Sequence, residues 1–249
     1  MRYFVELAYN GKAYHGWQNQ PNAISVQQVI ENALSTLLAK PISITGSGRT
    51  DTGVHATQMF AHFDTEVDFD EQNLIYRLNA FLPLDISIQS VFKVKSDAHA
   101  RFDATKRSYL YRICLEKNPF TIDFAYFFRA ELDIDAMNQA CNILFQYNDF
   151  QCFSKSNTDV KTYNCSITEA YWKQEENELQ FVISADRFLR NMVRAIVGTM
   201  IEIGLGKISV SDLHDIIKSK NRSKAGYSVP AHGLYLTKIE FPKEIKLNE

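Results

Sequence analysis

The sequence predicts an α+β fold in which antiparallel sheets are flanked by helices. Short stretches with the alternating apolar pattern of strands are interspersed with longer stretches whose apolar residues recur at helical spacing. Over the first hundred residues these elements follow the order strand–helix–strand–strand–helix–strand. That order is typical of a ferredoxin-like unit, in which helices cover one face of an antiparallel sheet.

The first half of the chain contains the clearest elements. Residues 2–9 are predicted to form a strand, and Ser25 precedes a helix whose apolar positions continue to Leu38. Gln28, three residues after Ser25, completes a capping-box pattern that places the start of this helix. The other elements predicted here are strands over 42–46, 58–64 and 86–94 and a helix over 71–81.

The second half repeats this mixture of elements. The patterns predict strands over 107–115, 166–173, 178–184 and 234–241, and helices over 135–146, 188–203 and 212–219. We therefore expect two α+β halves, residues 1–100 and residues 101–249. A chain of 249 residues can bury enough apolar surface to fold without disulfides or structural metals.

Composition narrows the class of protein. The formal net charge is −2, and no apolar run approaches the length of a membrane span. The N-terminus lacks the pattern of a signal peptide, so we expect a cytoplasmic protein without a membrane anchor. The four cysteines show no Cys-x-x-Cys spacing and are expected to be reduced, buried thiols.

One stretch carries the strongest chemical signal. Gly46–Ala56 places a single carboxylate, Asp51, in a glycine-rich turn between two predicted strands, two residues after Arg49. A carboxylate held on a rigid turn near an arginine is suited to act as a nucleophile or base. The alternative is an ordinary hairpin turn with a surface ion pair. The glycine spacing fits neither a P-loop nor a dinucleotide-binding fingerprint.

Two basic segments stand out on this nearly neutral chain. Residues 101–112 contain four basic side chains and one acid, and residues 186–194 contain Arg187, Arg190 and Arg194 and one acid. At spacings of three and four residues, these three arginines would share one face of the predicted helix. Such clusters suit a protein that binds a few phosphates at one place, and a solvated face is the alternative.

A pair of tyrosines lies in the strand predicted over 107–115. Alternation places Tyr109 and Tyr111 on the same face of that strand. From the residues alone, both are expected to be core side chains of a half-buried sheet. His55 and His62 are seven residues apart and have no nearby third ligand, so no metal site is expected there.

The segment Gly46–Ala56 closely resembles the active-site motif of the tRNA pseudouridine synthases of the TruA family, with Thr52 where the family usually has Ala. The resemblance continues, in order, over most of the chain. Further matching segments are 16–20, 79–86, 97–102, 104–109, 187–198 and 230–236. Together these segments are far more specific than any one of them.

This resemblance implies a fold and an activity. The fold would be that of the pseudouridine synthases, with two ferredoxin-like halves and a central cleft. The activity would be isomerisation of uridine to pseudouridine at positions 38, 39 and 40 of the tRNA anticodon stem-loop. Asp51 would be the nucleophile, attacking either C6 of uracil or C1′ of ribose. Neither a metal nor an organic cofactor is needed, because nothing is oxidised and no group is imported.

The resemblance also implies roles for other residues. Arg49 would pair with Asp51, and Tyr109 would stack on the target base, an interaction of about 1–3 kcal/mol. The remaining substrate-binding residues would be Arg101, Arg190, Arg194 and Leu236. Family members act as homodimers, so a second copy and tRNA are the expected partners.

Two other functions stay open on the residues alone. A non-catalytic RNA-binding module would suit ferredoxin-like halves with exposed aromatic side chains. A carboxylate hydrolase would normally need two acids at a defined separation, whereas the Asp51 motif contains a single acid. Loss of pseudouridine formation without loss of tRNA binding in an Asp51 variant would separate the enzyme from both.

Overall fold

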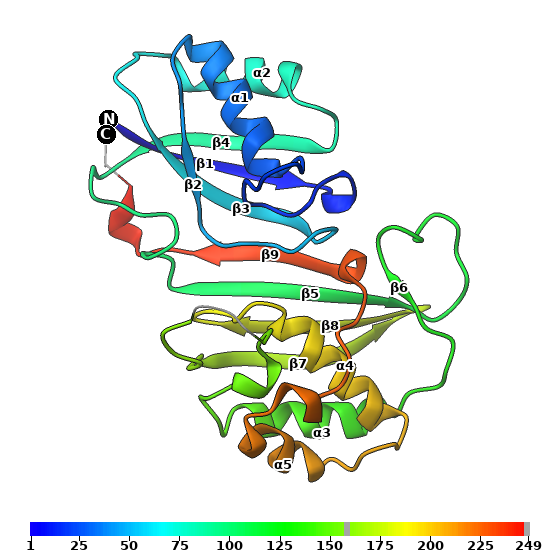
Figure 1. Ribbon diagram of the computed structural model, residues 1–249. Coiled ribbons are helices and arrows are strands. Elements are labelled where there is room, and N and C mark those ends of the chain that lie inside the picture. The colour runs from blue at the N-terminus through cyan, green and yellow to red at the C-terminus, as the bar shows by residue number, and fades with distance from the viewer. Residues whose placement is uncertain (157–159, 247–249) are drawn as a thin grey trace. The chain divides into compact units, whose positions relative to one another are not determined.

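The computed structural model describes residues 1–156 and 160–246 (Figure 1). Contacts divide the chain into two compact units, each considered by itself below. The first contains Met1–Lys106 and the segment from Leu236 onwards, and the second contains Arg107–Tyr235. Both units combine antiparallel strand pairs with helices, which confirms the predicted α+β class. The assignment of functional halves to residues 1–100 and 101–249 stays a prediction, since contacts do not test what each half does.

The first unit is built on a central strand pair. β1 (Arg2–Tyr9) runs antiparallel to β3 (His55–Asp64), and β4 (Ile86–Val94) lies on the other side of β1. The short β2 (Ile44–Gly46) pairs with β3, as does β9 (Leu234–Glu240), giving the order β4-β1-β3-β9 in this unit. The predicted strand over 58–64 thus begins earlier, at His55.

Two capped helices complete this unit. α1 (Val26–Leu38) begins where Ser25 Oγ accepts the backbone N–H of Gln28, and α2 (Glu71–Phe81) begins where Asp70 accepts that of Asn73. Such side-chain caps satisfy backbone donors that a helix leaves unpaired. The helices pack against each other, and α2 packs on β4. Both helix predictions are confirmed.

The second unit has a smaller antiparallel sheet. Its strands are β5 (Lys106–Cys114), β8 (Glu178–Ala185) and β7 (Ile167–Glu175), in the order β5-β8-β7. β6 (Tyr126–Phe127) pairs in parallel with the end of β5 and was not predicted. Two residues are too few for a readable alternation, so the sequence pattern gave no signal for it.

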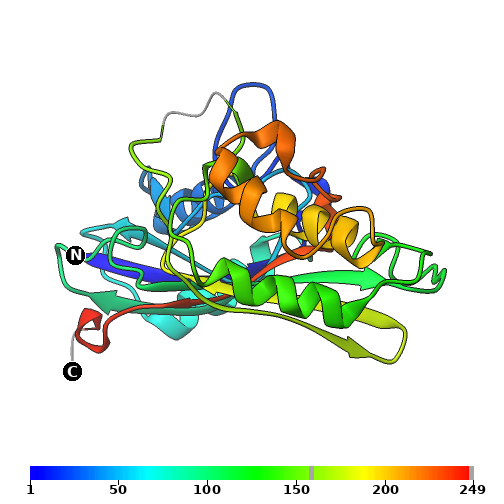
Figure 2. The same cartoon turned by 90° about the horizontal axis from the view of Figure 1, so that it is seen from below.

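Three helices lie on one side of β7 and β8 in this unit (Figure 2). α3 (Ile134–Leu144) packs on β7 and contacts both α4 (Met192–Gly204) and α5 (Asp212–Ser219). Short 3₁₀ helices lie between or after the longer elements in the described part of the chain. They are Gly11–Ala13, Gln151–Phe153, Arg222–Lys224, Ala231–Gly233 and Lys243–Ile245.

One helix prediction is wrong at its start. The helix expected over 188–203 begins at Met192, because Asn191 takes a left-handed conformation with φ of 67° and interrupts regular helix there. Arg187 and Arg190 therefore precede the helix, and Arg194 alone of the three lies in it. The prediction that these arginines share one helical face fails for that reason.

All four cysteines are free and buried. Burial is the first cause that raises the pKa of the Cys141, Cys152 and Cys165 thiols to about 12. Cys114 Sγ donates to the carbonyl of Glu116. Among residues 1–156 and 160–246, no helix is both long enough and apolar enough to cross a bilayer.

Candidate active site

The loop that carries Asp51 joins β2 to β3 in the first unit. Residues 47–54 make this connection, with the Asp51 side chain half-buried and Arg49 exposed. The backbone N–H of Ser47 donates to Phe60 O over 2.8 Å, which ties the start of the loop to β3. The N–H of Val54 donates to Asp51 O over 3.1 Å and closes a turn in which Gly53 has a φ of 78°. The start of the loop is thus anchored to β3, and its end is closed by an internal turn.

A second segment packs directly against this loop. The backbone N–H of Trp17 donates to Thr50 O over 3.2 Å. Gly16 has a φ of 87°, and a Cβ there would lie 2.4 Å from Thr50 O. Both the conformation and the close approach require glycine at this position. The segment around Gly16 therefore fixes the backbone immediately before Asp51.

The side chains of Tyr9 and His55 support the loop through hydrogen bonds. The hydroxyls of Tyr9 and Thr50 lie 2.8 Å apart in a buried hydrogen bond. His55 is also buried, and its Nδ1 accepts the backbone N–H of Gly11 over 3.1 Å. These bonds limit the conformations open to the turn, so the backbone that carries Asp51 is held in place by the fold itself.

Arg101 lies in a turn of the first unit that two histidines organise. His62 Nδ1 accepts the N–H of Ala100 over 3.2 Å, and His99 Nδ1 accepts that of Arg101 over 3.1 Å. Desolvation, followed by the charge of Arg2, lowers the pKa of His62 to about 4. The Arg101 guanidinium lies 5.7 Å from the centre of the exposed Phe102 ring. The turn presents a cation and an aromatic ring together.

The two tyrosines of β5 have different surroundings in the second unit. Tyr111 is fully buried, and its hydroxyl donates to Pro230 O over 2.8 Å. Tyr109 is half-buried, with its ring edge-to-face against Phe188 at a centroid distance of 5.1 Å. The expectation that both are core side chains thus holds for Tyr111, while Tyr109 is only half-buried.

Two other arginines predicted to bind substrate, Arg190 and Arg194, lie near the start of α4. Arg194 is half-buried, and its Nε donates to Val229 O over 2.6 Å. Arg190 is exposed on the turn before the helix, and its carbonyl accepts the N–H of Lys155 over 3.0 Å. Leu236, on β9, is buried at 2% exposure, so its side chain acts chiefly in packing.

The structure brings together some of the predicted residues. Arg49 and Asp51 share one loop of the first unit. Arg101 and Leu236 belong to the same unit but lie outside that loop. The second unit contains the other three, which are Tyr109, Arg190 and Arg194. Roles in catalysis or binding stay predictions for all seven.

The sequence reasoning missed two supports of the Asp51 loop, Tyr9 and Gly11. A Cβ at Gly11 would lie 2.0 Å from Val54 O, so the segment that contains both glycines approaches the loop backbone closely. The signal available in the sequence was the pair of glycines in a polar segment after the first strand. Tyr9 gave no signal, because it fits the alternation of a strand.

The arrangement supplies one half-buried carboxylate on a preorganised loop. Such a group can add to an electrophilic carbon or accept a proton. Within the part of the chain that the structure describes, no cluster of three or more His, Cys, Asp or Glu could hold a metal ion. The ring Nδ1 atoms of His55 and His62 both accept backbone N–H groups instead.

Comparison with known proteins identifies the family of this chain. A family model described as tRNA pseudouridine synthase matches residues 7–103 and 141–242. The tRNA pseudouridine synthase A of Bacteroides fragilis is 53% identical over 246 residues, covering 98% of each chain. That of Parabacteroides distasonis is 51% identical over 245 residues, covering 98% of this chain and 97% of the relative.

A more distant relative covers the chain almost as fully. The tRNA pseudouridine synthase A 2 of Clostridium perfringens is 37% identical over 237 residues, covering 94% of this chain and 97% of the relative. The family model spans both the Asp51 loop and the start of α4. From these matches, the chain belongs to the tRNA pseudouridine synthase family.

Proposed function

We propose that this protein isomerises uridine to pseudouridine in tRNA, at positions 38, 39 and 40 of the anticodon stem-loop. Membership of the family and the names of the relatives support the reaction and its substrate. The observation that carries the proposal is the Asp51 carboxylate, half-buried on a loop that hydrogen bonds fix on both sides.

The reaction needs no group beyond those of uridine and one carboxylate. The bond between C1′ and N1 breaks, the uracil turns, and C1′ forms a bond to C5. The hydrogen on C5 is lost and N1 gains a proton, so atoms balance. Asp51 adds to C6 of uracil or to C1′ of ribose and is released when the new bond has formed.

Other residues are proposed to hold the RNA. Tyr109 stacks on the target base, and its incomplete burial supports this role. Stacking of about 1–3 kcal/mol is of the size needed to offset extrusion of a nucleotide. Arg101, Arg190 and Arg194 contact the RNA, and the exposure of Arg101 and Arg190 supports this role. Arg49 pairs with Asp51, and Leu236 contributes by packing.

Tritium release from tRNA labelled at C5 of uridine tests this proposal. Asp51→Asn is expected to lower the rate by at least about a thousandfold, or about 4 kcal/mol of barrier. Binding of tRNA to this variant, measured by fluorescence anisotropy, should stay within a few-fold of wild type. Asp68→Asn is the matched control, since Asp68 is an exposed acid of the same unit outside the loop.

Each outcome of this experiment has a clear reading. Undiminished tritium release by the Asp51 variant would reject the catalytic role of this residue. Tight binding without tritium release by the wild-type protein would favour a non-catalytic RNA-binding module. Release of free uracil would instead indicate a hydrolase.

We further propose that the protein acts as a homodimer in the cytoplasm. A net charge of −2 gives a single chain little overall attraction for RNA, and two copies would combine their basic segments. The cytoplasmic location follows from the proposed tRNA substrate. Light scattering coupled to size-exclusion chromatography should give twice the mass of 28.6 kDa, and a monomer at working concentration would contradict the dimer.

A further inference from the structure

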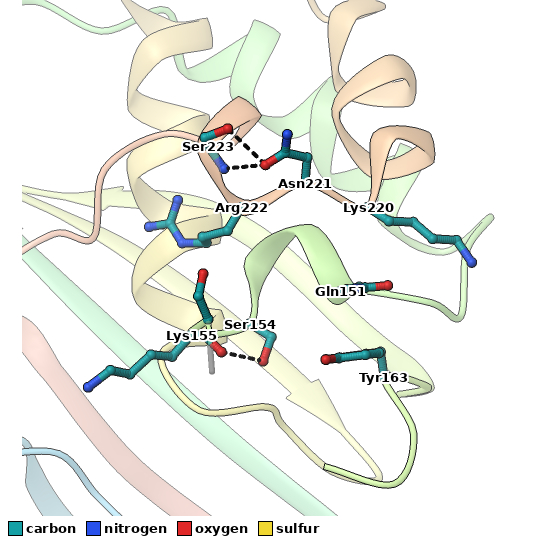
Figure 3. A pocket seen from close by; sticks show the side chains of 9 residues that line it. Gln151, Ser154, Lys155, Tyr163, Lys220, Asn221, Arg222 and Ser223 are labelled. Atoms are coloured by element: carbon teal, nitrogen blue, oxygen red, sulfur yellow. Dashed lines mark hydrogen bonds between the residues drawn. The ribbon is translucent and has the colours of Figure 1, made fainter. Parts of the chain in front are cut away.

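A surface pocket of about 590 Å³ lies within the second unit, formed by two segments far apart in the sequence (Figure 3). One segment includes the 3₁₀ helix Gln151–Phe153 and the residues after it. The other is the connection that follows α5 and enters the 3₁₀ helix Arg222–Lys224. None of the proposed catalytic or substrate-binding residues lines it. The pocket adjoins one of them, since the N–H of Lys155 donates to Arg190 O over 3.0 Å, but its lining is a different set of residues.

The lining of this pocket is polar and basic. Among the described residues, its side chains include three cations, Lys155, Lys220 and Arg222, together with hydroxyl and amide groups, and no carboxylate. Pockets for small organic molecules are mostly apolar, with few polar groups. Lys, Arg, Ser, Asn, Gln and Tyr side chains are those that contact the phosphates and sugars of nucleic acids. The lining therefore fits a phosphate-bearing backbone better than a compact apolar ligand.

The cation at the back of the pocket is held rigidly. Both terminal nitrogens of the Arg222 guanidinium donate to neutral oxygens, to Gly226 O over 2.9 Å and to Ser228 Oγ over 2.9 Å. Hydrogen bonds to neutral acceptors fix the orientation of the group without cancelling its charge. Asn221 fixes the adjoining backbone, since its Oδ1 accepts both the N–H and the hydroxyl of Ser223.

The two lysines lie on either side of this polar centre. Figure 3 shows Lys155 and Lys220 extending in opposite directions, with Gln151, Ser154 and Tyr163 between them. Both lysines are exposed. The Lys220 ammonium pairs with Asp149 Oδ2 over 2.7 Å, so this carboxylate just outside the lining competes with any anion for Lys220. Cations at both ends suit an extended strand that crosses the pocket.

We infer that this pocket binds the sugar–phosphate backbone of the RNA substrate, at a point separate from the target uridine. The inference rests on the proposed function for its RNA. Lys155 and Lys220 contact phosphates, Arg222 provides a fixed positive charge, and the amide and hydroxyl groups between them contact ribose or phosphate oxygens. Such contacts position RNA without reading its sequence, and they weaken as salt rises.

The test compares two double variants with the same change in net charge. Lys155→Gln/Lys220→Gln removes both flanking cations of the pocket. Lys117→Gln/Lys218→Gln removes two exposed lysines of the same unit outside it. Binding of unmodified tRNA is measured by fluorescence anisotropy over a series of KCl concentrations, after thermal melting has shown that each variant folds.

The pocket variant is expected to bind tRNA about tenfold more weakly at moderate salt. The slope of log affinity against log salt should fall by about 1–2, because each lost phosphate contact removes about 0.7–0.9 from it. In tritium release, the rise in KM should exceed any fall in kcat. The control pair should change the affinity less than about threefold. Equal losses in both doubles would overturn the inference, since they would reflect overall charge.

Asp149→Asn tests the inference in the opposite direction. It removes the carboxylate that competes for Lys220, while an amide oxygen can still accept the N–H of Gln151. We expect tRNA to bind about two- to threefold more tightly. Unchanged or weaker binding by a folded Asp149 variant would contradict a role for Lys220 in holding RNA.

Two further measurements separate the sources of phosphate and the two proposals. Calorimetry with inorganic phosphate and with uridine monophosphate asks whether the pocket takes a small anion. Tight binding of either, with tRNA affinity unaffected by the pocket variant, would overturn the inference in favour of a small ligand. If the wild-type protein released no tritium, the proposed function would fail instead, whatever the pocket variant does.

Discussion

The two units of this protein share one pattern of strand pairing, but the connections between their strands differ. In the first, β1 pairs with β3 and β3 with β2, and in the second, β5 pairs with β8 and β8 with β7. A helix precedes β2 and another precedes β7. The link from β2 to β3 is the Asp51 loop, residues 47–54, whereas Glu176 and Asn177 alone link β7 to β8.

This difference shows what it takes to place a reactive side chain at a strand connection. The geometry of a two-residue turn is set by the strands that it joins, and such a turn carries only the side chains of its own two residues. The longer loop carries Asp51 away from the strands, but its backbone then needs external support. Tyr9, Gly11 and Gly16 give that support through hydrogen bonds and close contact. Precision at Asp51 thus depends on residues distant from it in sequence.

The largest expected effect comes from removing the close approach to the loop. Gly16→Ala should lower the free energy of unfolding by about 3 kcal/mol or more, since a Cβ meets Thr50 O and the positive φ adds about 1–2 kcal/mol. Urea unfolding measures the loss, and tritium release should fall in parallel. Gly48→Ala is the matched control, with no atom within 4 Å of the added Cβ. Equal losses at Gly16 and Gly48 would show that close approach is not the cause.

A fall in pH should reduce the stability of the strand pairs in the first unit more than that of the corresponding pairs in the second. His62 on β3 has a pKa of about 4, below the 6.5 expected for an unfolded histidine, while the buried Ser184 on β8 does not titrate. Between pH 6.5 and 4 the unfolded chain takes up a proton at His62 before the folded chain does, so stability falls as pH falls. At pH 5, this difference in the pKa of His62 lowers the free energy of unfolding by about 2 kcal/mol or less.

Urea unfolding at pH 7.5 and pH 5 measures this dependence. His62→Gln should flatten it, because glutamine does not titrate and its amide oxygen can accept the N–H of Ala100. Some dependence should persist, since burial also lowers the pKa of His99. The same loss of stability between the two pH values in wild type and variant would contradict the assignment to His62.

The smallest effect is expected at the short connection. Glu176 has a φ of 52°, which costs a residue with a side chain about 1–2 kcal/mol relative to glycine. Glu176→Gly should therefore stabilise the protein by about 0.5 kcal/mol, after the greater freedom of glycine in the unfolded chain is subtracted. Thermal melting would show a small rise in Tm. A clear fall would mean that the Glu176 side chain contributes contacts that outweigh the backbone strain.

Local signals explain what the sequence could predict of this fold. The starts of α1 and α2 were readable because Ser25 and Asp70 are good capping residues before amphipathic stretches. The start of α4 was not, because apolar and basic residues continue at helical spacing on both sides of Asn191. Its left-handed conformation depends on tertiary surroundings, such as the bond from its side chain to Ser228 Oγ. Pattern alone carries no record of that bond.

The same reasoning separates the two candidate sites. The Asp51 loop was predictable as a connection between two strands because one contiguous motif contains the acid, its glycines and its flanking strands. The polar pocket was not, because residues after Gln151 meet residues after Lys220 only in the folded unit. Tyr109 and Tyr111 were indistinguishable by alternation. They differ because Pro230 lies within hydrogen-bonding distance of Tyr111.

The four buried thiols make the native protein a convenient target for site-directed labelling. A maleimide reacts with an accessible thiolate, and burial together with pKa values of about 12 at Cys141, Cys152 and Cys165 leaves little of that species. A fluorophore or spin label could therefore be attached at an introduced surface cysteine, for instance by Lys218→Cys, without first removing the natural ones. Alkylation of the natural thiols would then count the unfolded molecules in a preparation.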